Sequence, residues 1–390
     1  MFVPLTFDPS FRPFLNDLAQ FQSTKDLEES GLYRQLKPDI ERILSNVWYE
    51  EFIPRVPAGS DPARAVRVVA WNIERGMHLD PVIQCFRDRQ DLGSADVLML
   101  SELDWGMART ANRFVAREIA SALQMSYAFA PCYIALTKGA GVEKQANGEN
   151  AESLHGNAVL SRFPMHRVHS LALPNGKDKM KGAEKRIGSQ RAVIADIEHP
   201  AGMFRAVSLH LDAHSSQRHR HLQMRRVLDH LDTLQPALPV LIGGDWNTTT
   251  HNASRALYSI LGYFRRVLMG VRNVVANHYP YPDRWFERGL FGELERRGYE
   301  YRDLNTAGEC TLHYNVDDIA ANLNMSEWVP QWCFWFINWA LERTGGSCSM
   351  KLDWFAGKGV QPSAPAVAIP GLKVSDHDPI VLSAVPMGQL

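Results

Sequence analysis

The sequence predicts an α+β protein in which short apolar strands alternate with amphipathic helices. Residues 67–73 (RVVAWNI) are rich in β-branched side chains, and residues 97–100 are continuously apolar, as in strands of a sheet. Val115, Ile119 and Leu123 fall on one stripe of a helix. The 390 residues, 45% hydrophobic and 22% charged, are enough to bury a large core in one or two domains.

Residues 1–65 are expected to form an N-terminal helical extension. Apolar side chains recur at helical spacing after residue 10, and a second helix is expected to start near Pro38, where two acidic residues would lie in the first turn. Residues 57–65 have the composition of a linker. We therefore expect the main domain at 66–386, with a long helical insertion around 255–345.

Polar side chains stand at the ends of the first two strands of the main domain. The period of two places Asn72 and Glu74 on one face of the first strand, and the second strand ends at Glu102. Carboxylate and amide oxygens suit a hard cation such as Mg²⁺. A solvated strand end is the alternative for one such pair taken alone.

A second group of polar residues follows later strands. Residues 192–197 and 204–209 are expected to form an antiparallel pair that delivers His210. Three further histidines nearby are expected on the exposed face of a helix over 216–234. The stretch 241–250 (LIGGDWNTTT) ends an apolar strand in two glycines and then supplies Asp245 and Asn247, although a strand ending in Gly-Asp is often a simple turn.

The C-terminal part carries two more such strand ends. A short strand over 352–355 contains Asp353, and Asp376 with His377 precedes the final strand. An adjacent acid and imidazole can hold a metal and stabilise developing charge. Between these regions, residues 327–343 hold four tryptophans, which indicate a core or lid helix or, alternatively, an aromatic wall for a ligand or lipid.

Composition excludes several classes of protein. The net charge of −1 argues against nucleic-acid binding by bulk electrostatics, although the loop 175–191 has a local charge of +4 and could meet an anionic substrate. The five scattered cysteines form no CxxC pair, which favours a reducing compartment, and we expect a cytoplasmic protein. No secretory leader and no uncharged stretch of transmembrane length is visible, and the sequence does not identify a protein partner.

Seven motifs, taken in chain order, resemble the endonuclease/exonuclease/phosphatase (DNase-like) superfamily. Each motif is weak alone, but GDWN followed by SDHDP, with WNIE upstream, is specific. The motifs are WNIE (71–74), SELD (101–104), GNAVLS (156–161), LHLD (209–212), GGDWN (243–247), LDWF (352–355) and SDHDP (375–379).

The resemblance implies a four-layer α/β/β/α sandwich of two mostly antiparallel sheets flanked by helices. It also implies hydrolysis of phosphoesters with Mg²⁺ or Mn²⁺. In that family pattern Glu102 would be the main metal ligand, with Asn72, Glu74 and Asp376 close by. Convergent carboxylates repel one another unless a cation lies between them, which agrees with this assignment.

The same resemblance implies catalytic roles for five residues. Asp245 would orient or deprotonate the attacking water, and Asn247 would donate a hydrogen bond to the phosphate. His377, oriented by Asp353, would contact the phosphate as charge builds, and His210 would lie near the leaving group or a phosphate oxygen. Three residues near matching motifs are expected to contact substrate: Arg109, Asn157 and Arg191.

The function expected from these residues is metal-dependent phosphodiester hydrolysis, as in a nuclease. The substrate is expected to be a nucleic acid or a phosphorylated small molecule or lipid. One alternative is a lipid or inositol phosphate phosphodiesterase or phosphatase, which the basic loop and the tryptophan-rich segment favour. A catalytically silent binding member of the family is the other alternative, and it would be expected to have lost some of the site residues.

Overall fold

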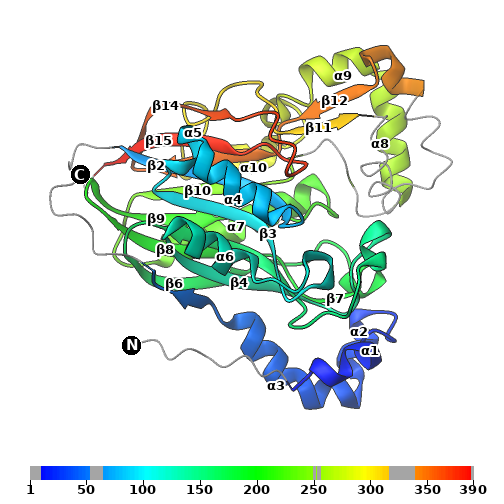
Figure 1. Ribbon diagram of the computed structural model, residues 1–390. Coiled ribbons are helices and arrows are strands. Elements are labelled where there is room, and N and C mark those ends of the chain that lie inside the picture. Colours follow the sequence, from blue (N-terminus) through cyan, green and yellow to red (C-terminus); the bar gives the residue numbers. More distant parts are fainter. Residues whose placement is uncertain (1–9, 53–64, 249–251, 253–255, 316–338, 388–390) are drawn as a thin grey trace.

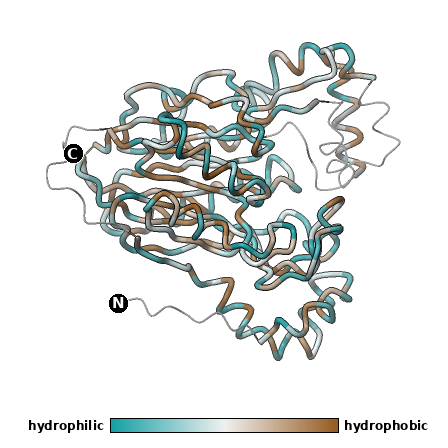
Figure 2. The backbone as a smooth tube through the Cα atoms, in the orientation of Figure 1, coloured by the Kyte–Doolittle hydropathy of each residue, from teal (hydrophilic) through white to brown (hydrophobic). Residues whose placement is uncertain are grey.

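The computed structural model describes residues 10–52, 65–248, 252, 256–315 and 339–387. Two β-sheets pack face to face, and helices cover their outer surfaces (Figure 1). This arrangement confirms the expected sandwich of two mostly antiparallel sheets flanked by helices. Hydrophobic residues run along the strands of both sheets (Figure 2).

The larger sheet has eight strands in the order β1-β4-β5-β3-β2-β15-β14, and β7 pairs with the free part of β4. Its neighbours are antiparallel except for β2 and β3, which run parallel. The strands are β1 (Trp48–Glu50), β2 (Val66–Arg75), β3 (Val97–Trp105), β4 (Ser126–Ala135), β5 (Leu154–Ser161), β7 (Arg186–Gly188), β14 (Val360–Ala368) and β15 (Ile380–Pro386).

The smaller sheet has five strands in the order β13-β10-β9-β8-β6. The expected antiparallel pair is confirmed as β8 and β9, and in this sheet the pair β9 and β10 runs parallel. The strands are β6 (Met165–Ala172), β8 (Arg191–His199), β9 (Gly202–Ser208), β10 (Val240–Asp245) and β13 (Asp353–Lys358).

Alternation along each central strand builds the layers. In β2, Val68 and Ala70 face the other sheet, whereas Val69 and Trp71 face the helices. The helices over the larger sheet are α4 (Leu79–Asp88), α5 (Gln90–Gly93) and α6 (Val115–Leu123). The smaller sheet is covered by α7 (Gln217–Thr233) and α10 (Arg288–Arg296), which pack on each other. Three short 3₁₀ turns lie in loops: η2 (Ala108–Thr110), η3 (Gly141–Gln145) and η4 (Lys179–Lys181).

The N-terminal region is helical, but its second helix does not start where the sequence suggested. It contains η1 (Arg12–Phe14), α1 (Leu15–Leu18), α2 (Thr24–Glu29) and α3 (Gly31–Ser45). The start expected near Pro38 is wrong, because α3 begins at Gly31 and Pro38 lies inside it. The Ser30 hydroxyl oxygen accepts a hydrogen bond from the Tyr33 backbone amide, which caps the start of the helix well before Pro38.

The region after β10 contains several short elements. These are α8 (Ala256–Leu268), α9 (Val271–Asn277), η5 (Pro282–Arg284), η6 (Glu342–Thr344) and a ribbon of β11 (Leu312–Asn315) with β12 (Ser347–Met350). Most of the tryptophan-rich stretch 327–343, like most of the linker 57–65, lies outside the described residues. Within the part that is described, no helix is both long and apolar enough to cross a membrane.

Candidate active site

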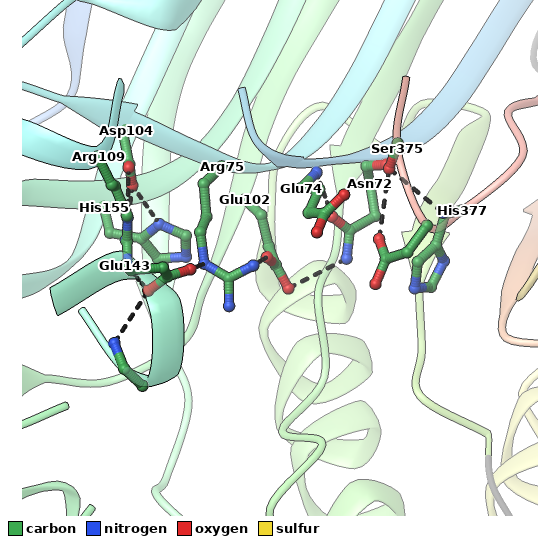
Figure 3. Close-up of polar contacts among 12 residues, drawn as sticks. Asn72, Glu74, Arg75, Glu102, Asp104, Arg109, Glu143, His155, Ser375 and His377 are labelled. Atoms are coloured by element: carbon green, nitrogen blue, oxygen red, sulfur yellow. Dashed lines mark hydrogen bonds and ion pairs between the residues drawn. The ribbon is translucent and has the colours of Figure 1, made fainter. Parts of the chain in front are cut away.

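The predicted metal-binding and catalytic residues converge at one edge of the sandwich, where β2 and β3 of one sheet meet β10 and β13 of the other. Asn72 joins the two sheets because its Nδ2 donates to Glu102 Oε1 and to Asp245 Oδ2, each at 3.1 Å. Asp245 and Asp353 are direct partners in the β10–β13 register. Residues far apart in sequence therefore form one cluster (Figure 3).

Irregular backbone aims the carboxylates of the first sheet. Glu74 and Glu102 have φ angles of 46° and 57°, at matching bulges in β2 and β3. Non-glycine residues seldom adopt this left-handed region, so the surrounding structure must hold them there. Hydrogen bonds do so: the Glu74 amide donates to Asn72 Oδ1 at 3.1 Å, and the Glu102 amide donates to Asn157 Oδ1 at 3.3 Å.

Asp245 is almost fully buried and densely surrounded. Its Oδ1 accepts the Asn247 backbone amide at 2.8 Å, and its Oδ2 accepts Asn247 Nδ2 at 3.1 Å. His210 Nε2 lies 3.5 Å from the same Oδ2. Burial raises the pKa of Asp245, although His377 and His210 oppose the shift. A carboxylate with a raised pKa is a better proton acceptor than an ordinary one.

His377 is held by a second carboxylate. Its Nδ1 lies 2.8 Å from Asp353 Oδ2, and its Nε2 lies 3.8 Å from Asp245 Oδ2. Burial alone would lower the pKa of His377, but Asp353 and Asp245 hold it well above its usual range. Thr311 Oγ1 donates to Asp353 Oδ2 at 2.6 Å and so fixes this carboxylate. The imidazole is therefore held in one orientation by Asp353, and the two carboxylates favour its protonated form.

Negative charge gathers beside Asn72. Burial and the Asp376 carboxylate raise the pKa of Glu74 to about 7, and Glu102 adds to the repulsion. Ser375 Oγ donates to the Asn72 carbonyl at 2.7 Å, which ties the segment carrying Asp376 to β2. Such mutual repulsion among carboxylates is expected where a cation binds.

Glu102 also contacts a positive side chain. Arg75 Nη1 lies 3.6 Å from Glu102 Oε2, and its Nε lies 2.8 Å from Glu143 Oε1. Burial opposes ionisation of Glu102, but Arg75 and His210 keep its pKa below the usual range. The line of charges continues through Glu143 to Arg109, as Figure 3 shows.

The three expected substrate contacts lie at different depths. Asn157 is buried and touches the cluster through the Glu102 amide, while its Nδ2 donates to the Arg191 carbonyl at 2.9 Å. The Arg191 side chain contacts β6 and not the cluster: its Nε donates to Ser170 Oγ at 3.0 Å. Arg109 has a fully buried side chain that is paired with carboxylates and separated from Glu102 by Glu143 and Arg75.

Sequence reasoning did not identify several residues that shape the site. Arg75 follows Glu74 directly, so its position after two candidate ligands was an available signal. Ser375 belongs to the SDHDP motif and could likewise have been singled out. Gln190, whose Nε2 lies 3.4 Å from His210 Nδ1, and Thr311 stand in stretches with no local pattern.

The donor chemistry fits a divalent cation. Glu74, Glu102 and Asp376 offer carboxylate oxygens and Asn72 an amide, which is the ligand set that Mg²⁺ and Mn²⁺ prefer. Ligand atoms of Asp245, Asp353 and His377 also lie within 4.8 Å of one another, and Asp353 Oδ1 has no hydrogen-bond partner. Two candidate cation sites therefore lie next to each other: the oxygen-rich group, and the trio of Asp245, Asp353 and His377, in which His377 Nδ1 already contacts Asp353 Oδ2.

Comparisons with known proteins agree with this fold. A model of the Endonuclease/Exonuclease/phosphatase family matches residues 45–377, whereas no curated protein sequence matches the chain. The endonuclease/exonuclease/phosphatase structure from Beutenbergia cavernae DSM 12333 is 16% identical with a TM-score of 0.50, covering 83% of this chain and 72% of the other. That likeness shows the fold alone.

Two further solved structures are similar at a lower level. A 3′-5′ exonuclease from Neisseria meningitidis has 13% identity and a TM-score of 0.46, with 81% of this chain and 98% of the other covered. The human Nocturnin catalytic domain has 13% identity and a TM-score of 0.44, with 87% and 96% covered. Because the family model spans most of its length, the chain belongs to the endonuclease/exonuclease/phosphatase family, whose members are generally phosphoester hydrolases.

Proposed function

We propose that the protein hydrolyses phosphoesters with the help of a divalent metal ion. One observation carries the proposal: Asn72 links Glu102 to Asp245 across the two sheets, next to His377, which Asp353 orients. This arrangement supports a cation site, a proton acceptor and a hydrogen-bond donor to the phosphate at one edge of the sandwich. Phosphoryl transfer needs such positioning and charge neutralisation more than covalent chemistry by the protein.

The metal site in this proposal consists of Glu102 as the main ligand, with Glu74, Asp376 and Asn72 around it. When bound there, Mg²⁺ or Mn²⁺ lowers the pKa of a coordinated water and neutralises phosphate oxygens. The choice between the two metals is part of the test below.

Asp245 is the proposed proton acceptor for the attacking water. Its raised pKa and its fixed orientation by Asn72 and Asn247 suit that role. Asn247 Nδ2 donates to the Leu211 carbonyl at 3.0 Å as well as to Asp245, so a bond to the phosphate requires it to release one of these partners.

The two histidines are proposed to act on the phosphate. His377 would donate from Nε2 to a phosphate oxygen as negative charge builds, while Asp353 keeps its ring in place. His210, whose Nε2 lies 3.9 Å from Glu102 Oε1, would lie near the leaving group or another phosphate oxygen. Asn157 would support Glu102 from behind.

The substrate is proposed to be a phosphodiester, with nucleic acids and phosphorylated lipids as the two classes to compare. The basic loop 175–191 uses part of its charge inside the protein: Lys179 pairs with Asp212 at 3.0 Å, and Lys185 donates to the Ala19 and Phe21 carbonyls. Fewer of its lysines are therefore available to bind a polyanion. A cytoplasmic location is also proposed, because the four described cysteines are free thiols, as is usual in a reducing compartment.

A substrate panel tests the proposal. The purified protein is incubated with bis-p-nitrophenyl phosphate, duplex and single-stranded DNA, RNA, sphingomyelin and inositol polyphosphates, with Mg²⁺, Mn²⁺ or EDTA. Metal-dependent cleavage is expected, and Asp245→Asn or His377→Ala should lower kcat by at least about a hundredfold. His166→Ala, which removes an exposed histidine paired with Glu198, is the matched control. Unchanged turnover in both site variants would refute the assignment.

A further inference from the structure

Helix α8 carries an exposed apolar stripe. Leu257, Leu261, Phe264 and Leu268 follow one another at spacings of four, three and four residues, so they lie along one face of the helix. Their exposed fractions are 62%, 56%, 46% and 87%. Water contact along a whole apolar face costs free energy, and such a continuous stripe usually marks an interaction surface. The helix stands at the periphery, away from both sheets (Figure 1).

The stretch of sequence that carries this stripe bears charge of one sign. From residue 246 to residue 282 the sequence has four arginines and neither aspartate nor glutamate. Arg265 and Arg272 are exposed, on α8 and on the neighbouring α9. An amphipathic helix with leucine and phenylalanine on one face and arginines beside it is suited to the interface of a bilayer that contains anionic lipids.

We propose that α8 docks on the surface of an anionic phospholipid membrane. Three of the four stripe residues are leucines, which bury well among acyl chains but cannot stack on bases, so nucleic acid fits the surface less well. A second copy of the chain fits less well too, because pairing two α8 helices would bring their arginines together without any acidic partner from this stretch.

The position of α8 in the chain connects this surface to the candidate active site. The helix begins nine residues after Asn247, so its start lies within about 32 Å of that residue even if the connection is fully extended. It packs on α9, which packs on β12, and the β11 partner of that strand bridges to His377 through Leu312. Docking therefore keeps the site near lipid phosphoesters, a consequence that rests on the proposed function.

Vesicle flotation tests the proposal without using activity. The full chain, in EDTA, is mixed with phosphatidylcholine vesicles with or without phosphatidylserine. We expect wild type to float with the anionic vesicles, less so at high salt, and the double variant Leu261→Glu/Leu268→Glu to partition at least about tenfold more weakly. Leu222→Glu, an exposed leucine on α7, is the matched control and should float like wild type. Unchanged thermal unfolding shows that each variant is folded.

Several results would overturn the docking proposal. The proposal is wrong if wild type stays in the vesicle-free fraction at both lipid compositions, or if the double variant floats as wild type does. A concentration-dependent dimer that the double variant abolishes would assign the stripe to a second copy, and loss of DNA or RNA retention in that variant would assign it to nucleic acid. Hydrolysis of bis-p-nitrophenyl phosphate needs no membrane. If the protein does not hydrolyse it, the proposed function fails, whereas the flotation result is unaffected.

Discussion

Replacing Arg109 with methionine separates two roles for this residue. In the structure its Nε and Nη2 donate to Asp104 at 2.7 and 2.9 Å, and its Nη1 donates to Glu143 at 2.9 Å and to Glu184 at 3.2 Å. Its side chain is completely buried. Methionine would fill much of the space but leave three buried carboxylates short of positive charge, so the loss should fall on stability.

The expected size is that of one broken buried ion pair, because each of the three carboxylates keeps another basic partner: His155, Arg75 or Arg186. Breaking a buried ion pair by removing one partner costs about 3–5 kcal/mol. At roughly 2.1 cal/mol/K per residue, unfolding 390 residues carries an entropy of about 0.8 kcal/mol/K. Arg109→Met should therefore lower Tm by about 4 to 6 °C. Burial raises the pKa of Glu184, whereas Arg109 helps to keep it below its usual range. The pKa of Glu184 should therefore rise in the variant.

Calorimetry of wild type and variant measures the change in Tm. Steady-state kinetics on the best phosphoester substrate measures whether KM also changes. Arg113→Met is the matched control, because Arg113 pairs with Asp80 and Glu118 at the surface and its loss should cost under about 1 kcal/mol. An unchanged Tm together with a raised KM in Arg109→Met would refute this reasoning and support the substrate contact expected from the sequence.

Three further experiments test other parts of the structure. Mg²⁺ or Mn²⁺ at about 100 times its Kd should raise Tm by about 3 °C, and Glu102→Gln should lose most of that shift. Burial would raise the pKa of Glu293, but hydrogen bonds from two arginines hold it at about 2. Wild type should therefore be more stable than Glu293→Gln by roughly 1 kcal/mol in urea unfolding at neutral pH. This difference should disappear as the pH falls from 4.5 through 2, because Glu293 then becomes protonated in the folded state too. Gly244→Ala would place a Cβ 2.2 Å from the Leu209 carbonyl oxygen and should cost about 1–3 kcal/mol, whereas Gly292→Ala, with no atom within 4 Å, should be stabilising or neutral.

Strong apolar patterns allowed much of the fold to be predicted from sequence. The continuous run at 97–100 became the central strand β3, and the stripe of Val115 and Ile119 became the buried face of α6. Edge strands were harder to predict. β14 contains Pro362 and Pro365, which are tolerated because one side of an edge strand needs no ladder bonds, and β6 exposes much of its surface.

The candidate site was predictable where a polar residue directly ends an apolar strand. Asp245 and Glu102 have that signature, and the structure brings them to the same amide of Asn72, although their roles stay predictions. Thr311 has no such signature: its contact with Asp353 spans 42 residues and depends on the pairing of β11 with β12, which brings Thr311 beside the chain that leads into β13. Contacts of this kind are created by tertiary structure and leave no local pattern.

The arrangement of strain and charge explains why the site would be set before a cation binds. Left-handed backbone at Glu74, Arg75 and Glu102 costs on the order of 1–3 kcal/mol at each position. The Glu74 and Glu102 amides donate to the side-chain oxygens of Asn72 and Asn157, so the fold itself maintains the conformations of these two glutamates. Arg75, His210 and His377 offset the repulsion among the carboxylates only in part, because the pKa of Glu74 stays raised. A bound cation would relieve that remaining repulsion without moving the backbone, so metal binding should raise Tm while leaving the positions of the strands unchanged.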